Sequence, residues 1–558
     1  APHFDVGLTE LQLSPEPRIE DWPKKAFRLR EKNGVIAVKA TGASPMDAAA
    51  IPGDDIIDLT DKLRSDGTLD WEVPPGTWTI LRVGMVSTGK MNQPATVGGV
   101  GLEVDKMDGA ILERFLDEGS VGQLIEVGGE HVGETFDFLS TDSWEVGTQN
   151  WSRGFAAAFE RRRGYPIMPW IPALEGRIVD SVEKTERFLW DYRRTVSELH
   201  AEVFTAGLRD YAHRHGMEYG GQPFNNGAFN DMEVSGQMDV VSAEFWPNRE
   251  GHNWHSLDLL VPSMAHTYGK PIVEAEAFTA ANRDAAYRQH PKALKALGDW
   301  AFTRGVNRYK FHTSAHQPWP EVQPRMSMGP FGINLHRNTT WAEQANGWLA
   351  YIRRCQAMLR EGRFVADLAY FIGEGAPNTI EREAEARAAL EGWRANALDH
   401  HMLLRASVED GQIVLPSGMR YRLLVLPDRE TMTPQVAAKI RDLVREGAAI
   451  LGPKPEHSPS LSGYPECDAR VRAIADEVWG ERPADRPREF GEGLVFTDGE
   501  PAEVLEELGV ERQFRFESED RKALVDFIQR TGEGADFFFL ASPGERPHRA
   551  ELSFRTTR

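Results

Sequence analysis

Four glutamates near the ends of apolar, strand-like segments are the residues of this sequence best suited to chemistry. Glu145 ends FDFLSTDSWE, Glu244 ends MDVVSAE, and Glu274 and Glu276 both lie in PIVEAEAFT. Residues two apart in a strand share a face, so Glu274 and Glu276 point the same way unless the strand ends between them. Two unpaired acids are costly inside a protein. The pattern therefore predicts that they reach a solvated mouth, or that one is paired with a base or a metal.

Paired carboxyl groups of this kind are what glycoside hydrolysis requires. One carboxylic acid protonates the leaving oxygen, and a second carboxylate acts as nucleophile or as base on water. Each of the three strand ends carries its Glu close to an aromatic residue. A single strand-end Glu is more often a solvated terminus or a salt-bridge partner, but three in one pattern favour an active site.

Further polar and aromatic residues follow the same predicted strands and are expected to bind the hydroxyls and ring faces of a sugar. The expected substrate-binding set is Asp142, Trp144, Trp246, Gln222, Asn225, His252, Glu274 and His312. The histidines show no HExxH spacing, and no EF-hand spacing occurs, so no metal motif can be read directly. Asp142 could bond the sugar, tune Glu145 or close the turn.

The elements that must position these residues alternate between strands and helices from about residue 121 to residue 365. The expected strands are QLIEVG, ETFDFLS, MEYGGQPF, MDVVSAEFW, KPIVEAEAF and VNRYKFHT. Strands that recur with helices between them indicate a parallel sheet. No phosphate-binding GxGxxG or Walker pattern occurs. We therefore predict a (β/α)8 TIM-like barrel, whose catalytic groups lie at the C-terminal ends of its strands.

The rest of the chain is predicted to form accessory domains of an α/β multidomain protein. Residues 1–120 read as a β-rich accessory domain, with GVIAVKA among its strands, and residues 121–365 as the catalytic barrel. Residues 366–535 contain a β-α-β unit and are expected to form a second α/β domain. Residues 536–558 contain two expected strands, which alone make only a marginal sheet. They read either as the start of a truncated β-domain or as an addition to a sheet elsewhere.

The excess of acidic residues limits the classes of partner that the protein can bind. The 558 residues include 85 acidic and 64 basic side chains, a formal charge of −21. Nucleic acids and anionic membranes need a basic footprint, so neither is expected as a partner. No apolar run approaches the length of about 18 residues that a membrane span needs. The two cysteines form no CxxC pattern. So few cysteines fit the cytoplasm or an export route, so the compartment stays open, with a periplasmic or secreted location favoured over a cytoplasmic one.

Seven segments that occur in one order resemble glycoside hydrolase family 106, the α-L-rhamnosidases. They are DSWE…QNW, RRGYPIMPWIPAL, FLWDYRRTVSEL, SAEFW, EAFT, FHTSAHQPW and NTTWAEQANGWLAYIRRCQAMLREG. The resemblance is strong over about residues 95–375 and weaker over the second α/β domain. It implies a (β/α)8 barrel with β-sandwich accessories, inverting hydrolysis of terminal α-L-rhamnosyl bonds, and a calcium ion near the sugar hydroxyls. Rhamnosylated small molecules or oligosaccharides are the implied partners.

The resemblance also implies roles for the glutamates. Glu145 takes the place of the general acid, and its tryptophan neighbours would provide a drier pocket that favours the protonated form. Glu276 takes the place of the general base, with Glu274 as its rival, and Glu244 is expected to serve the calcium or the sugar. The chain is shorter than typical members, which carry further β-domains. Two alternatives remain: a non-catalytic carbohydrate-binding protein, and a retaining glycosidase acting on another sugar.

Overall fold

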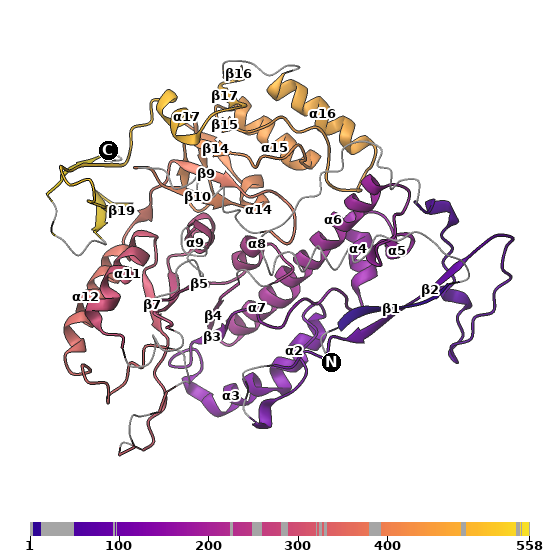
Figure 1. The fold of residues 1–558 in the computed structure, drawn as a ribbon, viewed down its shortest axis with the longest axis horizontal. Coiled ribbons are helices and arrows are strands. Elements are labelled where there is room, and N and C mark those ends of the chain that lie inside the picture. Colours follow the sequence, from indigo (N-terminus) through magenta and orange to yellow (C-terminus); the bar gives the residue numbers. More distant parts are fainter. Residues whose placement is uncertain are drawn as a thin grey trace.

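The computed structural model describes most of the 558 residues. The described residues are 4–12, 50–92, 95, 97–223, 227–247, 259–280, 288–319, 321–322, 326–327, 332–378, 392–480, 487–542, 547 and 549–556. They form a mixed α/β structure with two parallel sheets (Figure 1). Over these residues, every helix is too short or too polar to cross a membrane.

The first parallel sheet has five strands in chain order, with neighbours paired in parallel. These strands are β3 (Phe138–Thr141), β4 (Glu218–Gly221), β5 (Val240–Phe245), β6 (Val273–Ala277) and β7 (Arg308–Phe311). The Arg308 guanidinium lies 5.6 Å from the centre of the Phe138 ring, although β7 and β3 are opposite edges of the sheet. The sheet is therefore strongly curled. Closure into eight strands stays a prediction.

Helices connect and cover these strands. They include α4 (Phe155–Arg163), α6 (Val182–Leu199), α7 (Ala206–Arg214), α8 (Asp231–Gly236), α9 (Val261–Tyr268), α11 (Pro291–Thr303) and α12 (Ala345–Arg360). Local sequence sets their ends: the Ser181 hydroxyl accepts the Lys184 N–H at 3.1 Å and caps α6, and Pro291 occupies the first turn of α11. A π-helical segment, His200–Thr205, joins α6 to α7.

One expected strand is wrong. QLIEVG lies within α3, a helix that covers Ser120–Gly128. Val121 and Ile125, four residues apart, pack against the core, whereas Val127 is 87% exposed. A short apolar run cannot be assigned by periodicity alone, and here the helical spacing of the two packed residues prevails.

The N-terminal region pairs β1 (Phe4–Gln12) with β2 (Thr79–Ser87) in an antiparallel ribbon, which projects from the body in Figure 1. The expected strand GVIAVKA lies outside the described residues. Helix α2 (Gly109–Glu118) follows, capped by the Asp108 carboxylate. The boundaries predicted for this and the other domains stay predictions.

The second parallel sheet follows the order β10-β9-β14-β15-β17, with β16 antiparallel at one edge. Its strands are β9 (Leu368–Phe371), β10 (Ala395–Leu398), β14 (Leu423–Val425), β15 (Ala449–Leu451), β16 (Arg488–Phe490) and β17 (Gly493–Phe496), with helices α14 (His400–Leu404), α15 (Pro434–Arg445), α16 (Glu466–Trp479) and α17 (Pro501–Glu507). Small antiparallel sheets complete it, and they include pairings of β19 (Asp526–Gly532) with β20 (Ala535–Ala541) and β18 (Phe514–Glu517) with β21 (Glu551–Phe554).

Helix α6 holds the two sheets together through buried polar contacts. The Arg187 guanidinium donates to both carboxylate oxygens of Asp468, at 3.0 and 2.8 Å, and is 4% exposed. Asp191, one turn further on, accepts from the Ser460 hydroxyl at 2.6 Å and the Leu461 N–H at 2.9 Å. In Figure 1 the second sheet and its helices lie along one side of the first unit, against α6 and α9.

Candidate active site

The strand register brings two of the expected glutamates side by side. Glu244 on β5 is the direct neighbour of Glu276 on β6, and Glu276 is the direct neighbour of Lys310 on β7. Side chains at paired positions of adjacent strands lie on the same face of the sheet. The ends of β5, β6 and β7 therefore present two carboxyl groups and one amine in a row, two residues beyond a row formed by Ser242, Glu274 and Arg308.

Glu276 is held in a fixed orientation by its neighbours. Its Oε2 accepts a hydrogen bond from the Gln222 amide at 3.0 Å, and its Oε1 accepts from the Thr279 hydroxyl. The Nδ1 of His312 lies 3.9 Å from Oε1. Gln222 is 2% exposed, so its amide is positioned by packing. Both predicted substrate ligands, Gln222 and His312, thus face the Glu276 carboxylate.

Glu274 is paired with cations instead. Its Oε2 accepts from the Arg308 guanidinium at 2.7 Å, and its Oε1 lies 3.0 Å from the Lys310 amine. The side chain is only 8% exposed. A carboxylate engaged by two cations is less available to a substrate than one held by an amide and a hydroxyl, so this geometry favours Glu276 as the reacting group.

Glu244 has a strongly perturbed carboxyl group. Burial, followed by the charges of Glu276, Asp142 and Glu145, raises its pKa to about 7, and a hydrogen bond from the Trp246 side chain partly offsets the rise. These interactions show that the loop after β3 faces the ends of β5 and β6. The structure therefore gathers Asp142, Glu145, Glu244 and Glu276 around one site.

The Glu145 loop is anchored by Trp144. That indole is 9% exposed, packs edge-on against His200, Phe204 and Phe229, and donates its N–H to the Gly147 carbonyl at 2.6 Å. Trp144 therefore has a packing role, and its ring is not presented to the site. Glu145 itself is exposed. The expectation that tryptophans enclose Glu145 in a dry pocket is therefore wrong, because the Glu145 side chain is exposed to solvent.

Ser143 links the two acids of this loop. Its N–H donates to Asp142 Oδ1 at 3.0 Å, and its hydroxyl donates to Glu145 Oε1 at 2.8 Å. Further along, the Gln149 amide donates to Asp105, whose other oxygen accepts from Ser152 at 2.9 Å. Ser143, Asp105 and Thr279 were not predicted as site residues. Ser143 lies in the segment DSWE and Thr279 in the segment EAFT, whereas Asp105 lies in none of the segments quoted for the site.

Two predicted ligands, Asn225 and His252, lie outside the described residues. Trp246 is 8% exposed and acts on the Glu244 carboxyl group. Trp144, by contrast, packs into the core, and Glu274 is paired with Arg308 and Lys310.

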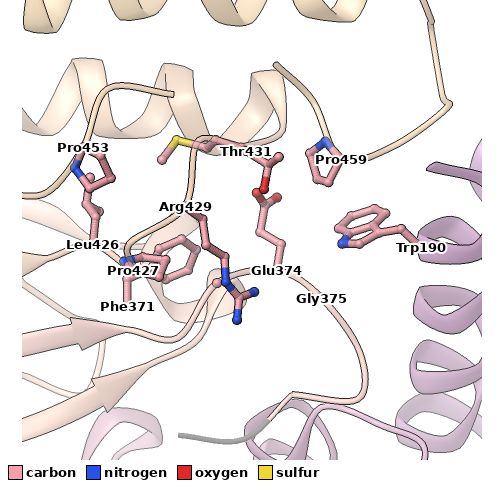
Figure 2. Close-up of a pocket in the computed structure, with 12 residues that line it drawn as sticks. Trp190, Phe371, Glu374, Gly375, Leu426, Pro427, Arg429, Thr431, Pro453 and Pro459 are labelled. Atoms are coloured by element: carbon pink, nitrogen blue, oxygen red, sulfur yellow. The ribbon is translucent and has the colours of Figure 1, made fainter. Parts of the chain in front are cut away.

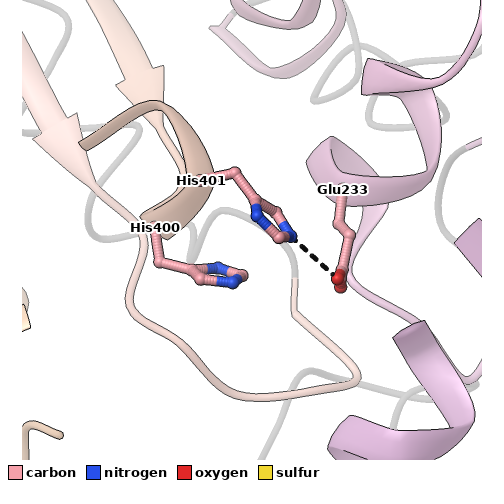
Figure 3. Close-up of side chains that lie close together, drawn as sticks. All are labelled: Glu233, His400 and His401. Atoms are coloured by element: carbon pink, nitrogen blue, oxygen red, sulfur yellow. Dashed lines mark hydrogen bonds and ion pairs between the residues drawn. The ribbon is translucent and has the colours of Figure 1, made fainter. Parts of the chain in front are cut away.

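A second group of titratable side chains lies where α14 meets α6 and α8 (Figure 3). Glu233 accepts from His401 Nε2 at 3.0 Å, from Arg194 at 3.1 Å and from Ser197 at 2.8 Å. His400 has Nε2 at 3.1 Å from Arg194. Glu233, His400 and His401 lie close enough to hold a metal ion in principle.

The hydrogen bonds of His400 argue against a metal ion bound by Glu233, His400 and His401. Arginine only donates hydrogen bonds, so His400 Nε2 must accept and its Nδ1 carries the proton. A protonated nitrogen cannot ligate a metal. The Arg194 guanidinium also keeps the pKa of Glu233 below its ordinary value although burial works against this. The group is an ionic contact between the two α/β units.

The comparisons with known proteins agree with this carbohydrate-type site. A family model for the α-L-rhamnosidases of glycoside hydrolase family 106 matches residues 3–558. A protein of Formosa agariphila named "Putative beta-glucuronidase" is 37% identical over 547 residues, which cover 97% of this chain and 45% of the relative. The solved structure of a rhamnosidase from Novosphingobium sp. PP1Y has a TM-score of 0.83 at 32% identity and covers 91% of this chain and 49% of its own. The chain thus spans about half the length of these relatives.

Proposed function

This chain belongs to the α-L-rhamnosidase family, glycoside hydrolase family 106, and we propose that it hydrolyses terminal α-L-rhamnosyl bonds by an inverting acid–base mechanism. The observation that carries the proposal is the gathering of Glu145, Glu244 and Glu276 from three separate strand ends at one site. Simple sugar binding does not require such repulsion between acids, whereas glycoside hydrolysis uses it. We further propose that the curled sheet forms part of a (β/α)8 barrel.

Glu145 is the proposed proton donor to the glycosidic oxygen. It lies on an exposed loop, so it can reach a bond that enters from solvent. Trp144 anchors the loop by donating its indole N–H to the Gly147 carbonyl. The Ser143 hydroxyl donates to Glu145 Oε1 at 2.8 Å and so orients the carboxyl group. A proton donor needs this orientation because transfer takes place only within hydrogen-bond distance of the leaving oxygen.

Glu276 is the proposed base that removes a proton from the attacking water. Gln222 and Thr279 each donate to one of its oxygens, which fixes the carboxylate plane. Glu145 follows β3 and Glu276 lies on β6, with β4 and β5 between them. Strands lie about 4.8 Å apart. Three such intervals exceed both the roughly 6.5–9.5 Å of inverting pairs and the roughly 5–5.5 Å of retaining pairs, and the curl of the sheet shortens the distance across the site. We propose the wider, inverting spacing, because water must fit between the carboxyl groups.

The residues at the site fit a calcium ion as cofactor. Ca²⁺ takes hard oxygen ligands. Burial is the largest cause of the raised pKa of Glu244, about 7, but the charges of Glu276, Asp142 and Glu145 add to it and mark a surplus of negative charge. Glu244 is the residue proposed to hold it. When bound, the ion would orient vicinal hydroxyls of the sugar ring.

The test is release of L-rhamnose from an aryl α-L-rhamnoside. We expect turnover by the wild-type chain and its loss in Glu276→Gln, while Glu218→Gln, an exposed residue that begins β4, retains it. Proton NMR of the first-formed product is expected to show the β-anomer. A folded chain that binds rhamnose without turnover would instead be a carbohydrate-binding protein, and an α-anomer as first product would indicate retention.

The name of the Formosa agariphila relative motivates one competing substrate. An aryl β-D-glucuronide carries a carboxylate at C5 and would meet the Asp142, Glu145, Glu244 and Glu276 acids. That repulsion disfavours an anionic sugar, so we expect the rhamnoside to be the better substrate. Faster hydrolysis of the glucuronide would overturn the assignment of the sugar but not that of the chemistry.

A further inference from the structure

A buried ion pair lies against the indole that anchors the Glu145 loop. The Lys106 amine pairs with the Glu103 carboxylate, and Lys106 is 4% exposed. The amine lies 5.3 Å from the centre of the Trp144 ring and 5.4 Å from the centre of the Phe204 ring. Phe204 belongs to the π-helical segment that joins α6 to α7, a type of segment that is frequent at functional sites. A cation within about 6 Å of an aromatic ring attracts it, most strongly where water is excluded. The charge of Lys106 therefore acts directly on the Trp144 indole.

The cation that faces Trp144 is Lys106 and not the neighbouring histidine. Burial lowers the pKa of the Lys106 amine, but Glu103 and Asp105 act in the opposite direction and favour its charged form. The His200 ring packs edge-on against Trp144 at 5.1 Å. Burial and the charge of Lys106 lower the pKa of His200 to about 3, so that ring is neutral. A buried ion pair contributes little to stability compared with apolar residues of the same volume. A role in placing the indole accounts for this pair better than stability alone.

The backbone of Lys106 holds the other side of the same loop. Its N–H donates to Gln149 Oε1 at 2.9 Å, and the Gln149 amide donates in turn to Asp105. Gln149 is fully buried. Glu145 therefore lies between two attachments to one short segment, through Trp144 before it and through Gln149 after it.

We propose that Lys106 is a positioning residue for the proton donor: its cation fixes the Trp144 indole and, through it, the turn that carries Glu145. The inference rests on the proposed function, in which Glu145 is the acid. The Trp144 N–H closes this turn on the Gly147 carbonyl at 2.6 Å, so a displaced indole displaces Glu145 as well. Proton transfer requires hydrogen-bond distance to the leaving oxygen. Lys106 is buried and acts through Trp144 instead of on the sugar.

The test removes the charge of Lys106 without leaving a lone charge behind. In the double variant Glu103→Gln/Lys106→Met both members of the ion pair become neutral, which a fold tolerates better than the loss of one. We expect kcat on a rhamnoside with a poor leaving group to fall about five- to thirty-fold, the factor that a desolvated cation–π contact represents. On a dinitrophenyl rhamnoside, whose leaving group needs no protonation, kcat should stay within two-fold of wild type, and KM should change little on either substrate.

Lys270→Met is the matched control. The Lys270 amine lies 5.5 Å from the centre of the Tyr268 ring and donates to the Gly236 carbonyl at 3.1 Å. Lys270 precedes the first residue of β6, whereas Glu276 lies near the last, so the two are at opposite ends of the strand. Any loss of kcat in this variant should be equal on the two substrates. An equal loss, or none, in the double variant would overturn the role of Lys106 and leave the proposed function intact.

The position of the indole is measured without turnover in the whole chain labelled with 5-fluorotryptophan. The Trp144 ¹⁹F resonance is assigned by Trp144→Phe, and Trp190, which lines a small cavity beside the second sheet (Figure 2), is the reference. We expect the Trp144 resonance to be narrow in the wild type and in Lys270→Met, and broadened or split in the double variant, with Trp190 unchanged in all three. A Trp144 resonance that shifts but stays narrow would show that the indole keeps its place and would overturn the inference.

Trp144→Phe provides a second route should the double variant not fold. It weakens the cation–π contact and removes the N–H that binds Gly147, so we expect the same selective loss on the poor leaving group. Equal losses on both substrates would contradict the inference. Absence of turnover of both rhamnosides by the wild type would count against the proposed function, and the Trp144 resonance would still decide whether Lys106 holds the indole.

Discussion

Removal of the Gln222 amide is the most direct test of how the candidate base is held. Gln222 Nε2 donates to Glu276 Oε2 at 3.0 Å, and the Thr279 hydroxyl holds the other oxygen. A hydrogen bond to a charged group is worth about 1.5–3 kcal/mol. Each 1.4 kcal/mol or so of activation free energy changes a rate about tenfold. If the whole energy of this hydrogen bond stabilises the transition state, Gln222→Ala should lower kcat roughly ten- to a hundred-fold.

The kinetic constants discriminate between two roles for Gln222. A residue that orients Glu276 affects the chemical step, so kcat should fall while KM stays within about two-fold of wild type. A residue that binds the sugar equally in ground and transition states would raise KM and leave kcat unchanged. The assay is the initial rate of aryl α-L-rhamnoside hydrolysis over a range of substrate concentrations, with a thermal melt to confirm folding.

Thr279 provides a matched pair of variants. Thr279→Val is nearly isosteric but removes the hydroxyl donor to Glu276, and Thr279→Ser restores it. We expect Val to lower kcat by an amount similar to Gln222→Ala and Ser to recover most of it. If Gln222→Ala and Thr279→Val both keep kcat within two-fold of wild type, the orientation of Glu276 by these donors does not matter for turnover and the reasoning is refuted.

Four further predictions concern the acid, the metal and the ionic contact between the units. Glu145→Gln should lower kcat about 10²–10⁴-fold for a rhamnoside with a poor leaving group, which must be protonated as it departs. The loss should be much smaller for a dinitrophenyl rhamnoside, whose leaving group needs no protonation. An equal loss on both substrates would exclude a proton-donor role for Glu145. Chelation should lower turnover and added Ca²⁺ restore it, with Glu244→Gln insensitive to both; activity unaffected by chelator in the wild type would remove calcium from the proposal. Glu233→Gln leaves the Arg194 guanidinium, 5% exposed, with an ion pair to Glu198 and a weaker charge interaction with Glu374. It should lower the free energy of unfolding by about 3 kcal/mol in urea titrations. Glu202→Gln, exposed on the adjoining π-helical segment, should change it little. Burial disfavours the charged form of His401, but Glu233 and Asp399 outweigh this effect and raise the pKa of His401 above its ordinary value. The ion pair with Glu233 therefore stabilises the fold fully below about pH 6.5, and this stabilisation is lost as the pH rises through the raised pKa. His401→Gln should flatten this part of the plot of unfolding free energy against pH, and an unchanged plot would contradict the role of His401.

The elements that carry the site were largely predictable from the sequence. Five of the six strands expected between residues 121 and 365 are strands in one parallel sheet, because these segments recur between helices and turn signals. Their glutamates were singled out because acids at strand ends are chemically unusual. QLIEVG failed because its apolar residues suit a strand or one helix face equally well, and only the packing of Val121 and Ile125 decides between them.

The roles of individual side chains were less predictable, because they depend on neighbours far away in the chain. Glu274 and Glu276 differ in the sequence only by two positions. What separates them is where the cations of β7 lie: the register sets Arg308 opposite Glu274, and the Lys310 amine, although Lys310 stands opposite Glu276, lies 3.0 Å from Glu274. Gln222, 54 residues before Glu276, turns from an expected sugar ligand into a donor to that carboxylate. Neither pairing leaves a periodic signal in the sequence.

Trp144 and Trp246 show why residue type alone could not assign the site. Both follow or precede a strand-end Glu and both are nearly buried. The Trp144 indole turns into the core and uses its N–H on Gly147, whereas the Trp246 side chain acts on Glu244. The apolar environment therefore surrounds Glu244 and leaves Glu145 in solvent. If Glu145 is the acid, the exclusion of water around it must come from the bound sugar itself, since the free protein leaves this carboxyl group exposed.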